Sequence, residues 1–319
     1  MATDKPEGTG VNKLLLEAGN SFDVALAAGN REDAEKALRD INEIKAAMRI
    51  RLDETLPLKH MSLEQAREIM GTDFLGPDEV GRTFGRKLEA NEVPPIPFSA
   101  KELREARILG QFLELRIDSD TEKNPLTMQR QQEVLDGRWS REGKGRLLYN
   151  TDWYIGENFF TKDAPQLQWV LVGKDVVPGT LNQNIVTQMD ALAAYVRDQV
   201  FKGRELPLEY ADAIADFERQ KAELERLYNS NRTECLGQIE GLALTKLCRR
   251  TPDDAVFDTA AYFDSTGTYL LPRIYDITRR RSSSGPMVYV GYADSSGVFV
   301  DGNDGLPDPG LGVVFARSR

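Results

Sequence analysis

Histidine and cysteine are nearly absent from this sequence, with one histidine and two cysteines among 319 residues. A nucleophilic serine or cysteine usually relies on a neighbouring histidine, and a structural zinc site needs about four nitrogen or sulfur ligands. The single histidine, His60, lies in a polar stretch and is expected on the surface. These absences argue against histidine-dependent hydrolysis, and no metal site is predicted.

The glycine motifs that cradle phosphates are missing as well. A P-loop needs four residues between its first glycine and the Gly-Lys-Ser/Thr triplet. Here five residues separate Gly137 from Gly143, and Gly145 occupies the place of the hydroxyl residue. No Gly-x-Gly-x-x-Gly follows a predicted strand, so a dinucleotide fold has no support and no cofactor is predicted.

Long apolar runs are missing too, since none approaches the roughly 20 residues that span a bilayer. Residues 1–10 lack the basic start and apolar centre of a signal peptide. Cys235 and Cys248 fall in residues 233–250, which are predicted to form one helix and to hold the thiols about 20 Å apart. A disulfide is therefore not expected, and two reduced, buried thiols suit a cytoplasmic location.

Basic residues are outnumbered by acidic residues, 41 against 51, which gives a formal net charge of −10. A surface of this sign repels phosphate backbones, so nucleic acid is not expected as a partner. Hydrophobic residues make up 40% of the chain, enough to build a core and to exclude wholesale disorder.

The remaining pattern is a helix-rich first part and a β-rich tail, which predicts an α+β fold. A rigid proline-rich segment, Val93-Pro94-Pro95-Ile96-Pro97, indicates a boundary. The predicted regions are a disordered lead at 1–10, a helical N-terminal region at 11–92, a mixed body at 99–266 and a small antiparallel β unit at 267–319, packed on the body.

Local signals mark three helix starts with particular strength. Ser62 with Gln65 and Ser99 with Glu102 form capping boxes, and the run 251–254, Thr-Pro-Asp-Asp, begins a third helix. A further helix is predicted from Asn124 to about Leu135. Strands are predicted at 112–118, 145–149, 153–161, 168–177, 269–278, 287–292, 298–300 and 313–316.

Two motifs in the tail have alternative readings. The run Arg279-Arg280-Arg281 is the densest basic run and could hold a phosphate or an acidic partner, although pairing with the protein's own carboxylates is favoured. The loop from Asp301 to Gly305 resembles a calcium loop, but its glycine stands one position too early for an EF-hand, so a turn is favoured.

Most of the chain, from Ile69 to Arg317, resembles a group of uncharacterised proteins from metagenomic, small-genome bacteria. The phrases that carry this resemblance are Ile69-Met70-Gly71, Phe74-Leu75-Gly76-Pro77, Pro94-Pro95-Ile96-Pro97-Phe98-Ser99, Leu109-Gly110-Gln111-Phe112-Leu113, Pro125-Leu126-Thr127-Met128, Trp153-Tyr154, Phe159-Phe160-Thr161, Leu206-Pro207 and Leu311-Gly312-Val313-Val314-Phe315. That group implies no particular activity.

The tail alone shows a second resemblance. Its alternation of short strands with Ser/Gly and Asp-Ser-Ser-Gly turns, closed by Gly312-Val313-x-Phe315-x-Arg317, is similar to the end of C-type-lectin-like and sulfatase-modifying-factor-like domains. Such domains display variable binding surfaces, and some are targets of diversity-generating retroelements. The tail departs from secreted lectins because it lacks cysteines and the expected tryptophan.

The resulting hypothesis is a binding or interaction protein that presents a polar C-terminal β surface to an unidentified protein or small ligand. Turns rich in Ser, Asp, Asn, Gly and Arg suit adaptable polar contacts. The candidate ligand-binding residues are Arg279, Arg280, Arg281, Ser283, Tyr289, Tyr292, Asp294, Phe299 and Asp301.

An enzyme without a recognisable motif is the alternative. Its site would lie in the aromatic-rich central region, around Trp153, Tyr154, Lys174 and the acidic helices. A polar pocket that holds a carboxylate with a raised pKa would favour it. Core packing is the preferred reading of these aromatic residues. A third alternative is a purely structural or assembly role for the amphipathic helices.

Overall fold

Residues 61–318, together with residues 24, 33 and 36, are described by the computed structural model of the chain. The chain divides into two compact units, Met1–His60 and Met61–Arg319. The predicted lead at 1–10, the helices predicted between residues 11 and 60, and His60 lie outside the described residues. Residues 61–92 belong to the same compact unit as the predicted body, so the division comes before the proline-rich segment.

The proline-rich segment packs onto the second unit instead of leading away from it. The indole Nε1 of Trp169 donates a hydrogen bond to the carbonyl of Pro94, at 2.8 Å. Ile96 is buried and forms an isolated β-bridge with Met61. These contacts hold the proline-rich segment rigidly as a part of the second unit.

The fold is α+β, with two four-stranded sheets of mixed direction. In the first sheet the spatial order is β1 (Phe74–Leu75), β2 (Gln111–Arg116), β3 (Gln168–Val176) and β8 (Val314–Arg317). β1 runs parallel to β2, and the other neighbours are antiparallel. β2 is buried along its whole length because structure covers both of its faces.

The second sheet contains most of the tail. Its spatial order is β6 (Gly297–Asn303), β5 (Met287–Asp294), β4 (Tyr275–Arg281) and β7 (Leu311–Gly312). The first three strands form an antiparallel meander, and β7 pairs with β4 in parallel. Along β5, Val288 and Val290 point to the interior while Met287 and Tyr289 point to the opposite side, as the period of a strand requires.

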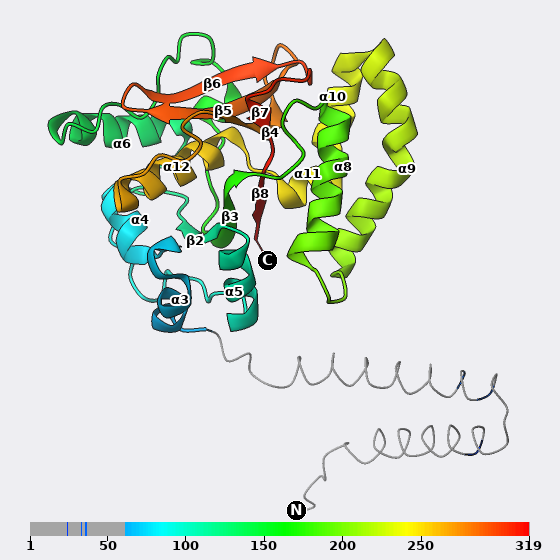
Figure 1. Cartoon of the computed structure of the whole chain (residues 1–319). Helices are drawn as coiled ribbons and strands as arrows, with labels where there is room; N and C mark the ends of the chain where they lie inside the picture. Colours follow the sequence, from blue (N-terminus) through cyan, green and yellow to red (C-terminus); the bar gives the residue numbers. More distant parts are fainter. Residues whose placement is uncertain (1–23, 25–32, 34–35, 37–60, 319) are drawn as a thin grey trace, which may run out of the picture. The chain divides into compact units, whose positions relative to one another are not determined.

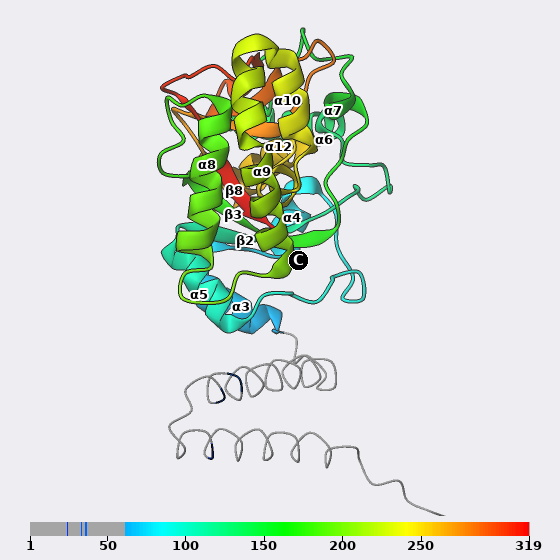
Figure 2. The same cartoon turned by 90° about the vertical axis from the view of Figure 1, so that its right-hand side faces the viewer.

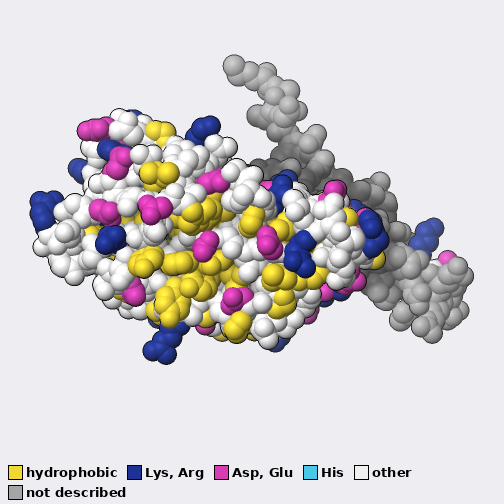
Figure 3. Space-filling model, turned by 90° about the horizontal axis from the view of Figure 1, so that it is seen from above, with side chains coloured by type: hydrophobic (Ala, Val, Ile, Leu, Met, Phe, Trp, Pro, Cys, Tyr) yellow, Lys and Arg dark blue, Asp and Glu magenta, His cyan; other side chains and the backbone are white. Residues whose placement is uncertain are grey.

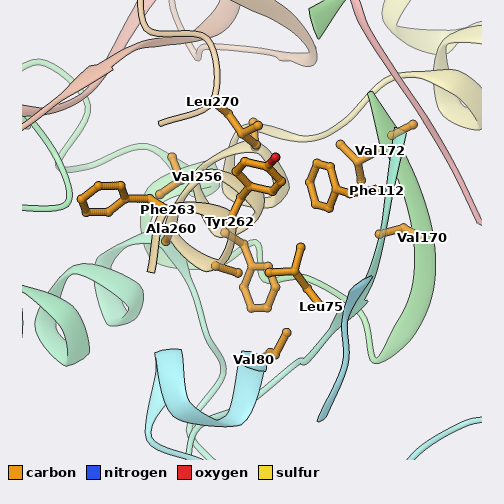
Figure 4. Packing of buried hydrophobic residues seen from close by; sticks show 14 of the residues in the cluster. Leu75, Val80, Phe112, Val170, Val172, Val256, Ala260, Tyr262, Phe263 and Leu270 are labelled. Atoms are coloured by element: carbon orange, nitrogen blue, oxygen red, sulfur yellow. The ribbon is translucent and has the colours of Figure 1, made fainter. Parts of the chain in front are cut away.

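A single helix, α12 (Pro252–Thr266), lies at the centre of the unit, against α4, α6 and both sheets (Figure 1). All of its residues from Pro252 to Phe263 are buried. The helix carries its own small and aromatic side chains on every side, which is the pattern of a helix enclosed by a core. Figure 4 shows Tyr262 of α12 facing Phe112 of β2, with ring centroids 5.0 Å apart.

The remaining helices cover the two sheets. Around the central core lie α3 (Leu63–Met70), the 3-10 turn η1 (Gly71–Asp73), α4 (Pro77–Phe84), α5 (Ala100–Ile108), α6 (Met128–Arg141) and α7 (Asn158–Thr161). A second layer stands to one side in Figure 1 and faces the viewer in Figure 2, and it has its own hydrophobic core, shared with Ile277, Met287 and Phe315. It comprises α8 (Ile185–Tyr195), the π-helical η2 (Val196–Val200), α9 (Leu208–Ser230), α10 (Arg232–Gly241) and α11 (Ala243–Cys248).

The capping predictions are confirmed. Ser62, Ser99 and Thr251 each accept a hydrogen bond from the backbone N–H at the third helical position, and the side chain at that position accepts one from the backbone N–H of the cap residue. Strand β3 also agrees with the predicted strand at 168–177.

Several predicted elements are wrong. The single helix expected over 233–250 is two helices, because Leu242 takes an extended conformation after Gly241. Both cysteines are nevertheless free and buried, as predicted. The helix expected from Asn124 begins at Met128, where Thr127 supplies the cap.

The strands predicted at 145–149 and 153–161 are absent. The first segment contributes one isolated bridge, Leu148 to Val298, and the second forms turns and the short helix α7. Its aromatic residues pack as a cluster, with the Tyr154 and Phe160 rings 5.3 Å apart. The segment is rich in aromatic residues because it packs in the core, and not because it forms a strand.

The tail is only partly the antiparallel unit predicted at 267–319. β7 is parallel to its neighbour, and β8 leaves the second sheet to join the first. Only Val313, which is buried, separates the two strands. Among the described residues no helix combines the length and apolarity needed to cross a membrane.

Candidate functional site

The basic run of β4 makes contacts within the protein. The Nε of Arg280 lies 3.2 Å from a carboxylate oxygen of Asp163, and the Nε of Arg281 donates to Glu240 at 3.0 Å. Arg279 donates from Nη1 to the carbonyl of Lys246, at 2.9 Å. The three side chains therefore reach different neighbours and do not form one basic patch.

Ser283 also has a structural contact. Its backbone N–H and its hydroxyl both donate to the carboxylate of Glu157, at 2.9 Å and 2.6 Å. This pair holds the β4–β5 turn to the segment that precedes α7.

Three of the predicted residues, Tyr289, Tyr292 and Phe299, lie on the side of the second sheet that faces away from α12. Here five aromatic side chains gather in one set of ring contacts, which we name the aromatic face: Tyr149, Tyr275, Tyr289, Tyr292 and Phe299. The Tyr275 ring is 4.8 Å from that of Tyr289, 5.5 Å from that of Tyr292 and 6.0 Å from that of Phe299. Tyr149 stacks on Phe299 from outside the sheet.

Strand register creates these contacts. Gly291 on β5 stands opposite both Tyr275 on β4 and Phe299 on β6. Without a side chain at Gly291, the two rings meet across the middle strand. A Cβ at this position would lie 2.3 Å from the carbonyl oxygen of Ile274, so only glycine fits.

Tyr292 owes its position to an irregularity of β5. The pairing of β5 with β6 shifts between Gly291 and Asp294, and Tyr292 adopts a positive φ of 47°. A bulge of this kind re-aims a side chain. Tyr292 is 48% exposed and stacks on Tyr275, which leaves one side of its ring available to a ligand.

The part of the chain that supplies β5 and β6 to the aromatic face is acidic, although Arg146 donates from Nη1 to the carbonyl of Tyr149 at 3.4 Å. Residues 282–316 contain no lysine, arginine or histidine and four aspartates, Asp294, Asp301, Asp304 and Asp308. Burial and the charge of Asp301 raise the pKa of Tyr289. Figure 3 shows hydrophobic side chains gathered on this side of the molecule, with charged side chains scattered around them.

The predicted aspartates accept hydrogen bonds from nearby backbone N–H groups. Asp294 accepts one from Ser296 at 2.7 Å in the turn between β5 and β6, and Asp301, which lies within β6, accepts one from Gly302 at 2.8 Å. Within the described residues, no group of three or more His, Cys, Asp or Glu side chains could hold a metal ion.

A polar pocket of about 290 Å³ lies at the start of α12. Its lining comes from the start of α12 with its cap, from β4, from the segment after α7 and from the first residue of β3. It consists of Lys162, Asp163, Ala164, Gln166, Gln168, Thr251, Asp253, Asp254, Arg279 and Arg280. Two of the predicted arginines therefore border this pocket, although the aspartates that complete it were predicted only as a helix start.

Asp253 is the unusual residue of this pocket. Its side chain is buried, and its Oδ1 has no hydrogen-bond partner among the described residues. Burial, followed by the charge of Asp254, raises the pKa of Asp253 to about 8. At neutral pH its carboxyl is therefore mostly protonated and can donate a hydrogen bond.

Behind the pocket lies a buried network of two arginines and three aspartates. Arg116 binds Asp258 through Nε at 2.8 Å and Asp254 through Nη1 at 2.9 Å. Arg250 binds Asp258 at 3.0 Å and Asp276 at 2.8 Å. Because every one of these charges is paired, the network anchors α12 between the two sheets.

Glu114 completes this network as a neutral acid. It is fully buried on β2, and burial together with the charge of Asp258 raises its pKa. The neighbouring Asp258 is held in the opposite state, since Arg116 and Arg250 lower its pKa despite its burial.

The residues of the predicted central enzyme site have other contacts. Tyr154 is buried, and burial raises its pKa. Trp153 donates from Nε1 to the carbonyl of Val300 at 3.0 Å, and Lys174 binds both carboxylate oxygens of Asp73 at 2.9 Å. These contacts support the reading of the aromatic stretch as packing.

Comparisons of this chain with protein-family models, with curated proteins and with solved structures found no match. The two surfaces described above therefore rest on their own geometry.

Proposed function

We propose that this chain is a binding protein whose aromatic face receives a cationic segment of a partner protein. The observation that carries the proposal is the set of five contacting rings. Three of them, Tyr289, Tyr292 and Phe299, lie in a stretch of 35 residues, 282–316, that holds four aspartates and no basic residue.

The aromatic rings attract a cation through cation–π interactions, which do not require a pocket. A lysine or arginine over a tyrosine face gains about 0.5–1 kcal/mol at an exposed site and about 2 kcal/mol when water is excluded. Tyrosines also provide rigid contact area at a small cost in side-chain entropy. The exposed rings of Tyr149 and Tyr292, 50% and 48% accessible, offer the first contacts.

The aspartates supply specificity. Asp301 and Asp308 are near enough to Tyr289 and Tyr275 to raise the pKa of both phenols, after the larger effect of burial. Their negative field favours a basic segment and disfavours an acidic one. The net charge of −10 extends this preference over longer distances at low salt.

Fluorescence polarisation with two labelled peptides tests the proposal. One peptide alternates lysine and arginine with glycine, and the other replaces each basic residue with glutamate. We expect saturable binding of the basic peptide alone, weakened by salt. Tyr292→Asn should weaken it about two- to thirty-fold, because asparagine tolerates the positive φ but removes the ring.

Two further variants complete this experiment. Asp301→Asn keeps an acceptor for the Gly302 N–H and should reduce both affinity and its salt dependence. Ile108→Asn, at an exposed apolar residue of α5, is the matched control and should bind as the wild type does. The proposal would be ruled out if all three variants bound the basic peptide as tightly as the wild type does, or if the wild type bound the two peptides equally.

The resemblance of the tail to C-type-lectin-like domains adds a genomic expectation. If the aromatic face is a diversified binding surface, a reverse transcriptase gene should lie beside this gene, with a near-repeat of the codons for the tail. Codons for Tyr289, Tyr292 and Phe299 should then vary between copies while the codon for Gly291 does not.

A further inference from the structure

We propose that the pocket at the start of α12 binds the anionic group of a small molecule, a phosphate or a carboxylate, between Arg279 and Lys162, with the carboxyl of Asp253 donating a hydrogen bond to it. This site is separate from the aromatic face and does not depend on the function proposed for that face.

The charges of the pocket favour an anion. Arg280 is paired with Asp163 at 3.2 Å, and Asp254 is paired with Arg116 at 2.9 Å. No carboxylate among the described residues lies within ion-pair distance of Arg279 or of Lys162. Two cations therefore lack a direct ion-pair partner, although the charge of Asp254 acts on Arg279 from a distance. They border a pocket of about 290 Å³, room for a small metabolite.

Arg279 is poised for such a ligand. It is partly buried, which lowers its pKa, and it donates one hydrogen bond to the carbonyl of Lys246. A guanidinium has five N–H donors in a fixed fork. The contact with Lys246 fixes the side chain and leaves donors for an oxyanion, which a guanidinium binds through two parallel bonds.

Asp253 supplies the second indication of a ligand. Its Oδ1 is buried and unpartnered, and its backbone carbonyl accepts a hydrogen bond from Nε2 of the buried Gln131 at 3.3 Å, which anchors the residue from behind. Native proteins rarely leave such an atom unsatisfied. A protonated carboxyl at the border of the pocket gains its partner when an anion enters, and the positive end of α12 adds to the attraction.

Calorimetric titration of the full chain with two probes at constant ionic strength and pH 6.5 tests this site. Sulfate stands for a phosphate ester and keeps its charge at alkaline pH, whereas malonate presents carboxylates. We expect saturable binding of at least one probe, and the probe that binds identifies the anionic group. Arg279→Gln and Lys162→Gln should each weaken it about tenfold, as the loss of a charge-assisted hydrogen bond predicts.

Arg281→Gln is the matched control, since Arg281 lies on the same strand but pairs with Glu240 outside the pocket. It should bind as the wild type does. Thermal melting of each variant separates loss of binding from loss of fold, and Lys162, which is exposed, can be replaced with little effect on the fold. Absence of saturable binding by both probes, or an equal effect of Arg281→Gln, would overturn the proposal.

A pH series identifies the role of Asp253. The charged groups that face it are Asp254 on its own helix, Lys162 and Asp163 after α7, and Arg279 and Arg280 on β4. Wild-type affinity should fall as pH rises from 6.5 to 9, because the carboxyl loses its proton and repels the anion. Asp253→Asn keeps a donor at every pH and should show no such fall, and identical pH profiles for the two proteins would refute the assignment.

Discussion

At the scale of single residues, the most informative side chain is Asp253. Its folded-state pKa of about 8 stands above the value of about 4 that an aspartate has in an unfolded chain. Between these two pH values the unfolded chain has released the proton and the folded chain has kept it. The stability that Asp253 contributes is therefore complete below about pH 4 and is lost as pH rises toward 8.

Asp253→Asn should accordingly stabilise the protein at alkaline pH. We expect its free energy of unfolding at pH 8.5 to exceed that of the wild type by about 1–3 kcal/mol, because the amide avoids a buried charge. At pH 4, where the unfolded carboxyl also keeps much of its proton, the two proteins should unfold nearly alike. Urea denaturation at both pH values measures this difference, and a gain of the same size at pH 4 would show that ionisation is not its cause.

Residue-scale chemistry was only partly predictable. The sequence places Asp253 at a helix start, where an exposed carboxylate is the ordinary expectation. Its burial arises from contacts with segments far away in the chain, such as Gln131 on α6. Likewise, the partners of Arg280 and Arg281, which are Asp163 and Glu240, could not be identified from local sequence.

At the scale of elements, α12 determines how the two sheets are joined. Phe257 stacks on Phe84 of α4 with ring centroids 4.4 Å apart, while Asp258 on the next position binds two arginines. The helix thus joins apolar packing to a charged network within one turn. Its start was predictable from Thr251, because a capping box is a local interaction, but its central position was not.

Phe257→Ala should lower the free energy of unfolding by about 3–5 kcal/mol, since it removes a fully buried ring and leaves a cavity. Chemical denaturation followed by circular dichroism measures the loss. Leu208→Ala, at an exposed residue of α9, serves as the control and should change stability by less than about 0.5 kcal/mol. Similar losses in both variants would contradict the central role of α12.

Strands were predicted correctly where an apolar segment lies in a sheet, and wrongly where an apolar segment packs in the core as a turn or a helix. The apolar run of β3 is a strand because it lies between two other strands of the first sheet. The aromatic run around Phe159 and Phe160 is equally apolar, but it forms a packed turn and α7. Composition alone does not distinguish these cases, because both bury their side chains.

At the scale of the whole molecule, the tail is divided between the two sheets. The backbone N–H of Val314 on β8 donates to Asp276 of β4 at 2.8 Å, and β8 then pairs with β3. The predicted unit at 267–319 therefore shares its last strand with the body. A boundary based on composition could not reveal this, because composition does not specify strand pairing.

A fragment of residues 267–319 should consequently fail to fold alone, whereas residues 61–319 should fold. A nitrogen–proton correlation spectrum of each fragment provides the measurement. We expect narrow amide dispersion for the short fragment, since it lacks both α12 and the partner of β8. A well-dispersed spectrum from residues 267–319 would instead establish an independent tail.

The chain passes from β7 in the second sheet to β8 in the first through Val313, and this determines when the first sheet can be completed during translation. β8 follows every other described strand, and the first sheet lacks its fourth strand until residues 314–317 have left the ribosome. During translation the nascent chain must therefore wait with β3 unpaired along one edge. The first sheet can be completed only after β8 has emerged, and a pause before the codons for residues 314–317 would prolong the period in which that edge is open to chaperones.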